Sequence, residues 1–366
     1  MKSNYKRLGD YIEPIKFRNS EMKAKELLGI NINKHFMPSV ANIVGTDLSN
    51  YKLVQKNQFA CNRMHVGRDY RIPVAVSESE EPFIVSPAYD VFEIKDSKKL
   101  LPEYLMMWFE RAEFDRHAWF YTDADVRGGL AWQAFEDMQL PIPHPDKQRE
   151  IINEYKTIQN RIALNQQLIQ RLEETAQAIY REWFVEGIDL ENLPEGWSFN
   201  KLDIFTKLKY GKMLDSELFL EKGYPVFSGY GIRGFYSEYM YEEPQILVLC
   251  RGVSGTGEVR LSPRFSYITN LSIVVEIIKP TVSKMYLYYY LRNSDLRALD
   301  SGSAQSMITT GDLYFLDALL PPSGLQMKFD NVANLIMREI ENKKNENQKL
   351  TELKELLLSR LATVEN

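Results

Sequence analysis

A pattern of prolines, a glutamine and a long helical tract occurs twice in this chain, and it constrains the fold more than any other feature. The first copy reads LPIPHPDKQREI from Leu140 to Ile151, and the second reads LLPPSGLQMKF from Leu319 to Phe329. When the two glutamines are aligned, Gln326 follows Gln148 after 178 positions. A period of this length is too long for a solenoid, so it predicts a duplicated half.

The tracts after both glutamines have the periodicity of long amphipathic helices. In the first tract, steps of four and three residues alternate, which is the a/d seam of a coiled coil. Its seam positions are Ile151, Tyr155, Ile158, Ile162, Asn165, Ile169, Leu172, Ala176, Ile179 and Trp183. The second tract is less regular and uses Phe329, Ala333, Ile336, Ile340, Leu350, Leu357 and Leu361. We therefore expect spacer helices within residues 146–190 and 325–366, and Gly187 is expected to follow the end of the first helix.

A helix with one apolar stripe is not stable alone, so each of these helices needs a partner. From Gln148 to Phe184 the first would be roughly 55 Å long at 1.5 Å per residue. The simplest partner is the other helix, lying antiparallel, because a whole globular segment separates the two in the chain. The alternative is that each helix packs only on its own domain. Asn165, Lys343 and Asn347 fall on the seam, where a polar residue lowers stability but fixes the register.

Residues 1–145 and 191–324 precede the two helices, and both segments mix strand-like runs with short helices. EPFIVSPAYDVFEI and then LPEYLMMWFERAEF predict strands followed by an amphipathic helix, and FSYITNLSIVVEI and SKMYLYYYLRNSDL repeat that order. The predicted fold class is therefore α+β. It has two similar globular α/β domains, separated by two long antiparallel coiled-coil helices, with pseudo-two-fold order. Because the detailed sequences differ, the two domains are expected to recognise different things.

The composition limits the classes of function. A net charge of -5 gives no overall signal for nucleic-acid binding, so any basic surface must be local. Cys61 and Cys250 stand beside apolar runs and indicate buried thiols in a reducing compartment rather than a disulfide framework or a metal site. No apolar run approaches the ~20 residues of a membrane span, and the amino terminus lacks the apolar core of a secretory signal. We expect a soluble, cytoplasmic protein.

Three familiar signatures of cofactor binding or catalysis are weak or missing. Gly229, Gly231 and Gly234 spell G-x-G-x-x-G, but the aromatic, proline-stopped FYSEYMYEEPQ follows instead of a helix, which disfavours a dinucleotide site. The chain contains no Asn/Asp-Pro-Pro-aromatic tetrapeptide of the adenine-methyltransferase type and no Walker phosphate loop. We therefore expect no methyl transfer and no ATP-driven translocation by this chain.

Several phrases, in this order, resemble the specificity subunit of type I restriction-modification enzymes along essentially the whole chain. IPHPDKQREIINEYKTIQNRIALNQQLIQRLEETAQAIYREWF looks like the central helix of that family, and LPEGWSFNKL looks like the beginning of a target-recognition domain. GYPVFSGYGIRGFYSEYMY and VRLSPRFSYITNLSIVVEI look like the interior of that domain. The resemblance implies target-recognition domains over 1–145 and 191–324, a central spacer helix over 146–190 and a C-terminal spacer helix over 325–366.

The resemblance also implies a function, which is that of a non-catalytic DNA-recognition subunit in a host-defence restriction system. Each target-recognition domain would read one half of a bipartite, asymmetric site in double-stranded DNA. The helices would set the separation of the domains and dock two methyltransferase (M) subunits, and restriction/translocase (R) subunits would complete the complex. S-adenosylmethionine, ATP and Mg would bind to the partner subunits, with no cofactor in this chain. Independently, a ~55 Å spacer corresponds to roughly 16 base pairs of DNA.

Local runs of basic, amide and hydroxyl residues are the candidates for DNA contact, since Arg, Lys and small polar donors bind phosphates and bidentate Arg, Asn or Gln reads bases. In the first domain the candidates are Asn62, Arg63, His65, Arg68, Arg71, Arg127 and Gln133. In the second they are Tyr210, Lys212, Ser228, Tyr230, Arg233, Arg251, Ser254, Thr256, Ser303, Gln305 and Ser306. Replacing Arg63 or Arg251 by alanine is predicted to weaken DNA binding without unfolding the chain.

Two other classes of function remain as alternatives. One is a coiled-coil protein-interaction scaffold without DNA specificity. The other is a self-contained nuclease or methyltransferase with diverged motifs. Salt-dependent, sequence-selective DNA binding separates the first alternative from the DNA-recognition hypothesis. Metal- or S-adenosylmethionine-dependent activity of the purified chain alone would favour the second.

Overall fold

The computed structural model of this 366-residue chain describes residues 5–40, 45–64, 66–122, 128–252, 255–300 and 306–365. It divides into two compact units. Unit 1 comprises Met1–Asn165 together with Asn345–Asn366, and unit 2 comprises Gln166–Lys344. Each unit contains one globular domain and a part of each of the two long helices.

Each globular domain is built on a four-stranded antiparallel sheet with the same strand order. The order is β2, β9, β6, β7 in unit 1 and β12, β18, β15, β16 in unit 2. In unit 1 the strands are β2 (Ile12–Ile15), β6 (Phe59–Cys61), β7 (Val74–Val76) and β9 (Asp90–Ile94). In unit 2 they are β12 (Thr206–Tyr210), β15 (Ile246–Leu249), β16 (Val259–Leu261) and β18 (Ser272–Ile277). The continuous apolar runs FAC and ILVL are buried along their whole length, as expected of inner strands.

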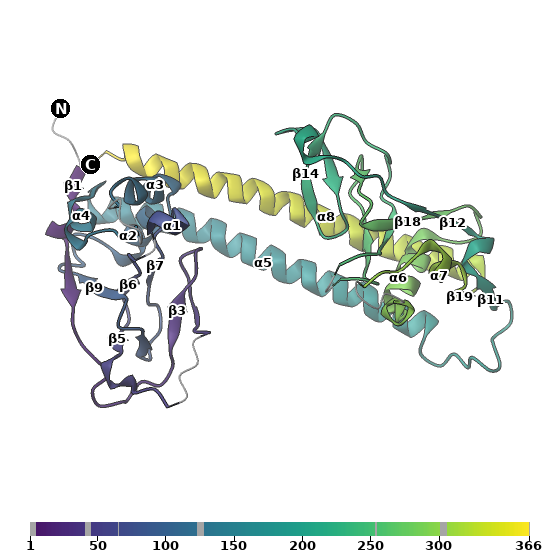
Figure 1. Ribbon diagram of the computed structural model, residues 1–366, viewed down its shortest axis with the longest axis horizontal. Helices are drawn as coiled ribbons and strands as arrows, with labels where there is room; N and C mark the ends of the chain where they lie inside the picture. The colour runs from purple at the N-terminus through teal and green to yellow at the C-terminus, as the bar shows by residue number, and fades with distance from the viewer. Residues whose placement is uncertain are drawn as a thin grey trace. The chain divides into compact units, whose positions relative to one another are not determined.

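The same smaller elements follow each sheet in the same order, so the expected duplication is present in the fold (Figure 1). A helix follows the long strand: α2 (Pro102–Phe109) in unit 1 and α6 (Lys284–Asn293) in unit 2. A shorter helix comes later: α4 (Trp132–Asp137) and α7 (Thr310–Tyr314). An antiparallel ribbon completes each domain, namely β1 (Tyr5–Arg7) with β10 (Gln139–Pro141), and β11 (Ser198–Lys201) with β19 (Asp317–Leu320).

The two domains differ in what is added to this scaffold. Unit 1 adds two ribbons and two short helices: β3 (Leu28–Ile30) with β4 (Phe36–Pro38), β5 (Lys52–Val54) with β8 (Phe83–Val85), α1 (Val66–Asp69) and α3 (Ala112–Phe120). Unit 2 adds a three-stranded sheet of β13 (Tyr224–Phe227), β14 (Ile232–Tyr236) and β17 (Tyr267–Ile268). A shared scaffold with different additions fits two domains that recognise different targets.

Both long helices are present. α5 runs over the 40 residues Pro145–Phe184, and α8 over the 38 residues Ser323–Arg360, with a 3-10 turn at Leu361–Thr363. The first helix ends at Phe184, just before Gly187, as the sequence indicates. Gly187 explains the ending, because its positive φ of 76° is a left-handed conformation that commonly follows a helix end.

α5 and α8 pair antiparallel within each unit. In unit 1, the Arg161 Nε donates to the Glu346 Oε1 at 2.7 Å, and the Asn165 Nδ2 donates to the Asn347 Oδ1 at 2.8 Å. In unit 2, the Lys344 Nζ lies 4.0 Å from the Glu173 Oε1. The polar seam residue Asn165 thus meets the polar seam residue Asn347, and Asn165 is buried. A shift of either helix would leave a buried amide unpaired, so this contact specifies the register.

The core of each unit takes side chains from both helices. Ile151, Ile152 and Tyr155 of α5 lie in the unit 1 core together with Leu358 and Leu361 from the end of the chain. The unit 2 core contains the corresponding late part of α5 and early part of α8, through Ala176, Tyr180, Phe184, Phe329 and Ala333. Each helix therefore packs in both units, which rules out the alternative that each serves only its own domain.

The repeated glutamine fastens the start of each long helix to its domain. The buried Gln148 Nε2 donates to the carbonyls of Lys99 at 2.7 Å and Pro143 at 2.8 Å, and its Oε1 accepts from the Leu101 N–H at 2.9 Å. The buried Gln326 has the same role: its Nε2 donates to the Pro321 carbonyl at 2.7 Å, and its Oε1 accepts from the Ser283 N–H at 2.9 Å. Each side chain satisfies backbone groups of the prolyl turn and of the segment just before α2 or α6.

Within the described residues, every helix is too short or too polar to cross a lipid bilayer.

Candidate nucleic-acid interface

Four segments of the second domain that the sequence marks as candidates meet at one end of its sheet. Tyr210 ends β12, and Arg251 follows β15 by one residue. The Tyr230 hydroxyl donates to the Arg251 carbonyl at 2.7 Å, and Arg251 forms an antiparallel bridge with Met307. The Tyr210 hydroxyl accepts from the Thr310 N–H at 3.3 Å. The loops after β12, β13 and β15 and the segment before α7 thus form one surface.

Exposed cations and phenols line this surface. Lys212, Arg233 and Arg251 are exposed, and none of the three takes part in an ion pair within the described part of the chain. The Tyr210 and Tyr230 side chains are 37% and 46% exposed, so their rings remain accessible although their hydroxyl groups are engaged. Accessible cations next to aromatic rings are the residue types that bind phosphates and bases.

Three predicted hydroxyl contacts lie beside this surface and bond to the protein itself. Ser228 is 1% exposed, and its Oγ donates to the Gly231 carbonyl at 3.2 Å. Thr256 is 5% exposed, and its Oγ1 donates to the Gly252 carbonyl at 2.6 Å. The Ser306 Oγ donates to the Asp300 carboxylate. These hydroxyl groups hold the loops in shape, and a direct DNA contact by any of them stays a prediction.

In the first domain, the expected contact residue Arg63 has a structural role. Its Nε donates to the Asp90 Oδ2 at 2.7 Å, its guanidinium donates to the Leu130 carbonyl, and it lies 5.4 Å from the centre of the Trp132 ring. Its side chain is only 19% exposed. Replacing Arg63 by alanine would remove an internal ion pair as well as any DNA contact. The expectation that this change leaves the fold intact therefore lacks support, and Arg251 is the cleaner probe.

The other described candidates of the first domain differ in accessibility. Arg71 is exposed, and Arg68 is exposed but forms a two-bond ion pair with Asp69 at 2.7 and 2.9 Å. The Asn62 Oδ1 accepts from the Met64 N–H at 3.1 Å, and the exposed Gln133 donates to Asp137 at 3.0 Å. The remaining candidates, His65, Arg127, Ser254, Ser303 and Gln305, lie outside the described residues.

The two candidate surfaces occupy corresponding places in their domains. In the first, the Leu130 N–H donates to the Arg63 carbonyl just after β6, at 3.0 Å. In the second, the Ile308 N–H donates to the Cys250 carbonyl just after β15, also at 3.0 Å. β6 and β15 are the third strands in the matching sheet orders. The sequence shows the segments involved, but only the fold shows that they are equivalent.

The glycine pattern that imitates a dinucleotide site lies in a β-hairpin. Gly229 and Gly231 have positive φ angles of 84° and 151° in the turn between β13 and β14, and Gly234 lies within β14. A strand therefore follows the turn, where a dinucleotide site would have a helix. The cofactor interpretation, which the sequence already disfavours, has no structural support.

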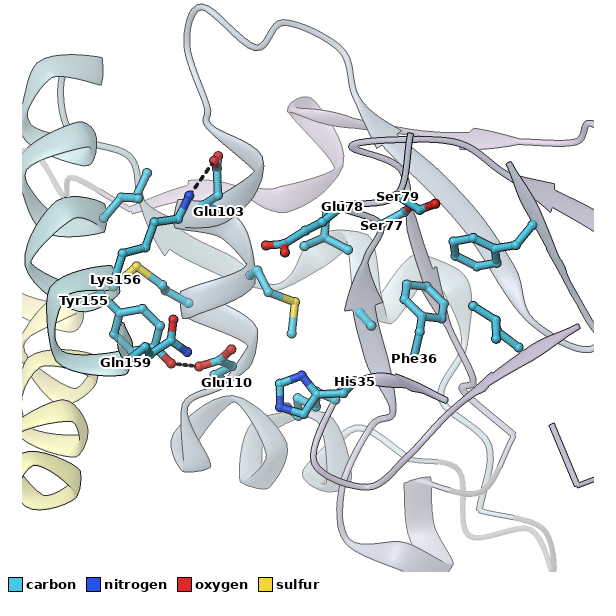
Figure 2. Close-up of a pocket in the computed structure, with 18 residues that line it drawn as sticks. His35, Phe36, Ser77, Glu78, Ser79, Glu103, Glu110, Tyr155, Lys156 and Gln159 are labelled. Atoms are coloured by element: carbon cyan, nitrogen blue, oxygen red, sulfur yellow. Dashed lines mark hydrogen bonds and ion pairs between the residues drawn. The ribbon is translucent and has the colours of Figure 1, made fainter. Parts of the chain in front are cut away.

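The first domain also has a cavity of about 440 Å³ between α2, α5, β7 and the β3–β4 ribbon (Figure 2). Its charged lining is largely paired within the protein. The Lys156 Nζ donates to the Glu103 Oε1 at 3.1 Å, and the Tyr155 hydroxyl donates to the Glu110 carboxylate. Burial, together with the nearby Glu110 charge, raises the pKa of Tyr155 and keeps this phenol protonated. The paired groups fasten α5 to α2, and the cavity shares no residue with the candidate interface.

A family model and one curated relative each match part of the chain. Residues 194–353 match the type I restriction modification DNA specificity domain. The Type I restriction enzyme HindI specificity subunit of Haemophilus influenzae is 24% identical over 158 residues. That alignment covers 42% of this chain and 33% of the relative, so it extends over about a third of the relative's length.

Two solved structures have this fold over nearly the whole chain. One is the S subunit of a type I restriction-modification system from M. genitalium, with a TM-score of 0.62 and 16% identity, covering 99% of this chain and 96% of that one. The other comes from work on the structural basis of complex assembly and conformational transition of the type I R-M system. It has a TM-score of 0.51 and 16% identity, and the match covers 98% of this chain and 96% of that one. The specificity-domain match contains the second globular domain, and the first domain repeats the scaffold of the second. The chain is thus similar to type I restriction-modification specificity subunits in the sequence of its second half, and it has the fold of a solved S subunit over nearly its whole length.

Proposed function

We propose that this chain is the DNA sequence-recognition subunit of a type I restriction-modification complex, and that each globular domain reads one half of a bipartite, asymmetric site. One observation carries the proposal. In both domains the candidate contact segments leave the same scaffold at corresponding strand ends, yet their exposed side chains differ. Two equivalent platforms with different contact residues suit two different half-sites on one duplex.

The proposal can be tested on the exposed cations of the second domain. In the full complex, the double variant Arg233→Ala/Arg251→Ala is expected to bind cognate DNA more weakly. The slope of log K against log salt should also become shallower by about 0.9 for each phosphate that the variant no longer neutralises. Equilibrium binding at several salt concentrations measures both quantities. Unchanged affinity and slope would count against this surface.

A matched control is available in the same domain. Lys222 is exposed and precedes β13, whereas the candidate loop follows the other end of that strand. Lys222→Ala removes one positive charge and should leave the affinity nearly unchanged. If the unmodified complex shows no sequence preference at any salt concentration, the scaffold alternative replaces the proposal.

The long helices are the proposed docking site for the methyltransferase (M) subunits. Leu164 on α5 is 59% exposed, and Leu353 and Leu356 on α8 are 49% and 59% exposed. Leu353 and Leu356 are three residues apart and share one helix face. An apolar stripe on the outer side of a helix that already has a partner suits a further helical partner. The restriction/translocase (R) subunits would join this assembly, and S-adenosylmethionine, ATP and Mg would bind to those partners.

Charges placed on this stripe should prevent assembly. Leu353→Glu/Leu356→Glu is expected to abolish co-purification with the M subunit while leaving the thermal unfolding of the isolated chain unchanged, because both side chains are exposed. Lys349→Glu is the control, since it adds a negative charge on an exposed position of the same helix. Normal assembly of the leucine double variant would place the docking surface elsewhere.

The chain itself is proposed to be non-catalytic, as specificity subunits generally are. The self-contained nuclease or methyltransferase alternative predicts metal- or S-adenosylmethionine-dependent modification of DNA by the purified chain. The present proposal predicts none until the M subunits are added.

A further inference from the structure

A group of exposed aromatic side chains lies at the end of α3 in unit 1. Tyr70, Trp119, Phe120 and Tyr121, which we call the aromatic patch, are 63%, 45%, 76% and 48% exposed. The Tyr70 and Trp119 ring centres are 5.4 Å apart, as are those of Phe120 and Tyr121. Soluble proteins rarely expose contiguous apolar groups of this size unless they bind something there.

The aromatic patch is continuous with the candidate DNA surface of the first domain. α3 packs against α1, as Figure 1 shows. Thr122, directly after the patch, forms an antiparallel bridge with Leu130, and the Leu130 N–H donates to the Arg63 carbonyl. Gly67 and Gly128 cross so closely that a Cβ on Gly67 would lie 2.7 Å from the Gly128 Cα. The aromatic patch therefore lies next to the close approach of Gly67 and Gly128, on the candidate DNA surface of the first domain.

Two arginines and a histidine lie near the rings. Arg71 is exposed and forms no ion pair among the described residues, and the His117 ring lies 4.9 Å from that of Tyr121. Arg116 is exposed on the same helix, where it pairs with Glu113 at 3.0 Å. Exposed rings next to arginine side chains suit DNA, which has stacked bases and charged phosphates, better than they suit an apolar protein surface.

The second domain has no counterpart of the aromatic patch among its described residues. The element that follows α6, as α3 follows α2, is the 3-10 helix Leu296–Leu299 with the sequence LRAL, and Leu296 is buried. The aromatic patch is therefore an addition to one domain and not part of the shared scaffold.

We propose that the aromatic patch inserts at a base step of the half-site read by the first domain, with Phe120, its most exposed ring, as the leading side chain. This inference rests on the proposed function. Apolar wedges between bases unstack one step and kink the duplex. The cost depends on the step and is lowest for pyrimidine–purine steps. The first domain would thus recognise its half-site partly by how easily one base step unstacks, and the second domain would not.

The test uses the full complex and a duplex carrying the recognition site mapped from genomic methylation. Phe120→Ala is expected to weaken binding about 5- to 150-fold, the range for removing one aromatic ring that stacks on a base. Fluorescence energy transfer between dyes at the two duplex ends should show that the Phe120→Ala complex bends the DNA less than the unmodified complex does. Phe120→Leu should retain most of the affinity and bend, because leucine also acts as a wedge. A mismatched base pair at the inserted step should restore the affinity of the Phe120→Ala complex, because the mismatch lowers the cost of unstacking.

Phe315→Ala in unit 2 is the matched control, since Phe315 is also 76% exposed and lies outside the aromatic patch. The possible failures are distinguishable. If the unmodified complex has no sequence preference, the proposed function itself fails. If it has one, and Phe120→Ala binds and bends DNA normally, only the wedge fails. If Phe120→Ala loses its M subunits but any assembled complex binds DNA normally, the patch docks protein, which also overturns the inference.

Discussion

Replacing Lys34 by methionine is expected to destabilise unit 1 by about 3–5 kcal/mol, because it breaks a buried ion pair from one side. The Lys34 side chain is 5% exposed, and its Nζ donates to the Asp115 Oδ1 at 2.8 Å and to the Phe109 carbonyl. Burial lowers the pKa of Lys34, and the attraction of Asp115 opposes that shift. Without the ammonium group, a buried carboxylate lacks its counter-ion.

Chemical denaturation of the single variant and of Lys34→Met/Asp115→Asn measures this effect. The double variant should regain most of the missing stability, because a neutral amide needs no counter-ion and its oxygen still accepts from the Ile72 N–H, which bonds Asp115 at 3.1 Å. Lys56→Met is the control, since Lys56 forms an exposed pair with Glu80 and such pairs contribute little. Equal losses in Lys34→Met and Lys56→Met would contradict the assignment.

The second large effect is expected for Gln148→Ala, which should lower the free energy of unfolding by about 3 kcal/mol. Two carbonyls and one N–H would be without their partner in a buried place, and each unsatisfied group costs about 1–3 kcal/mol before relaxation. Gln326→Ala should cost less, since its side chain satisfies only one carbonyl and one N–H.

Urea unfolding at constant m-value would measure this series. Gln167→Ala, an exposed position on α5, should change stability by no more than about 0.5 kcal/mol. A Gln148→Ala protein as stable as Gln167→Ala would show that the repeated glutamine has no anchoring role.

The helices and their pairing were predictable because periodicity is a local property of the sequence. A seam of apolar residues with polar interruptions requires a partner with a matching interruption, and Asn165 does meet Asn347. The helix end after Phe184 was also predictable, since Gly187 follows it and takes the left-handed conformation that commonly comes after a helix end. Lys34 was not predictable at all. Its partners Phe109 and Asp115 lie far along the chain, and nothing in NINKHF distinguishes this lysine from an exposed one.

The candidate interface was likewise predictable only in part. Segments rich in glycine, arginine and tyrosine in the second domain were identified from composition, and they do meet at one end of the sheet. Composition does not separate an exposed hydroxyl from a buried one, so it indicates Ser228 and Thr256 as well as Arg251. The run of rings ending in Tyr121 does not by itself indicate a binding surface, because aromatic residues usually indicate a core. Its signal is three consecutive rings at the end of a helix that already supplies the buried Phe114 and Ala118.

The contribution of Leu358 and Leu361 to the unit 1 core has a consequence for how the protein matures on the ribosome. Unit 2 is one uninterrupted stretch of chain and can close as soon as Lys344 has emerged. Unit 1, although most of it is translated first, also needs Leu358 and Leu361, which follow the whole of unit 2 in the chain. The two units are therefore expected to be completed in the order opposite to the order in which their first residues are synthesised.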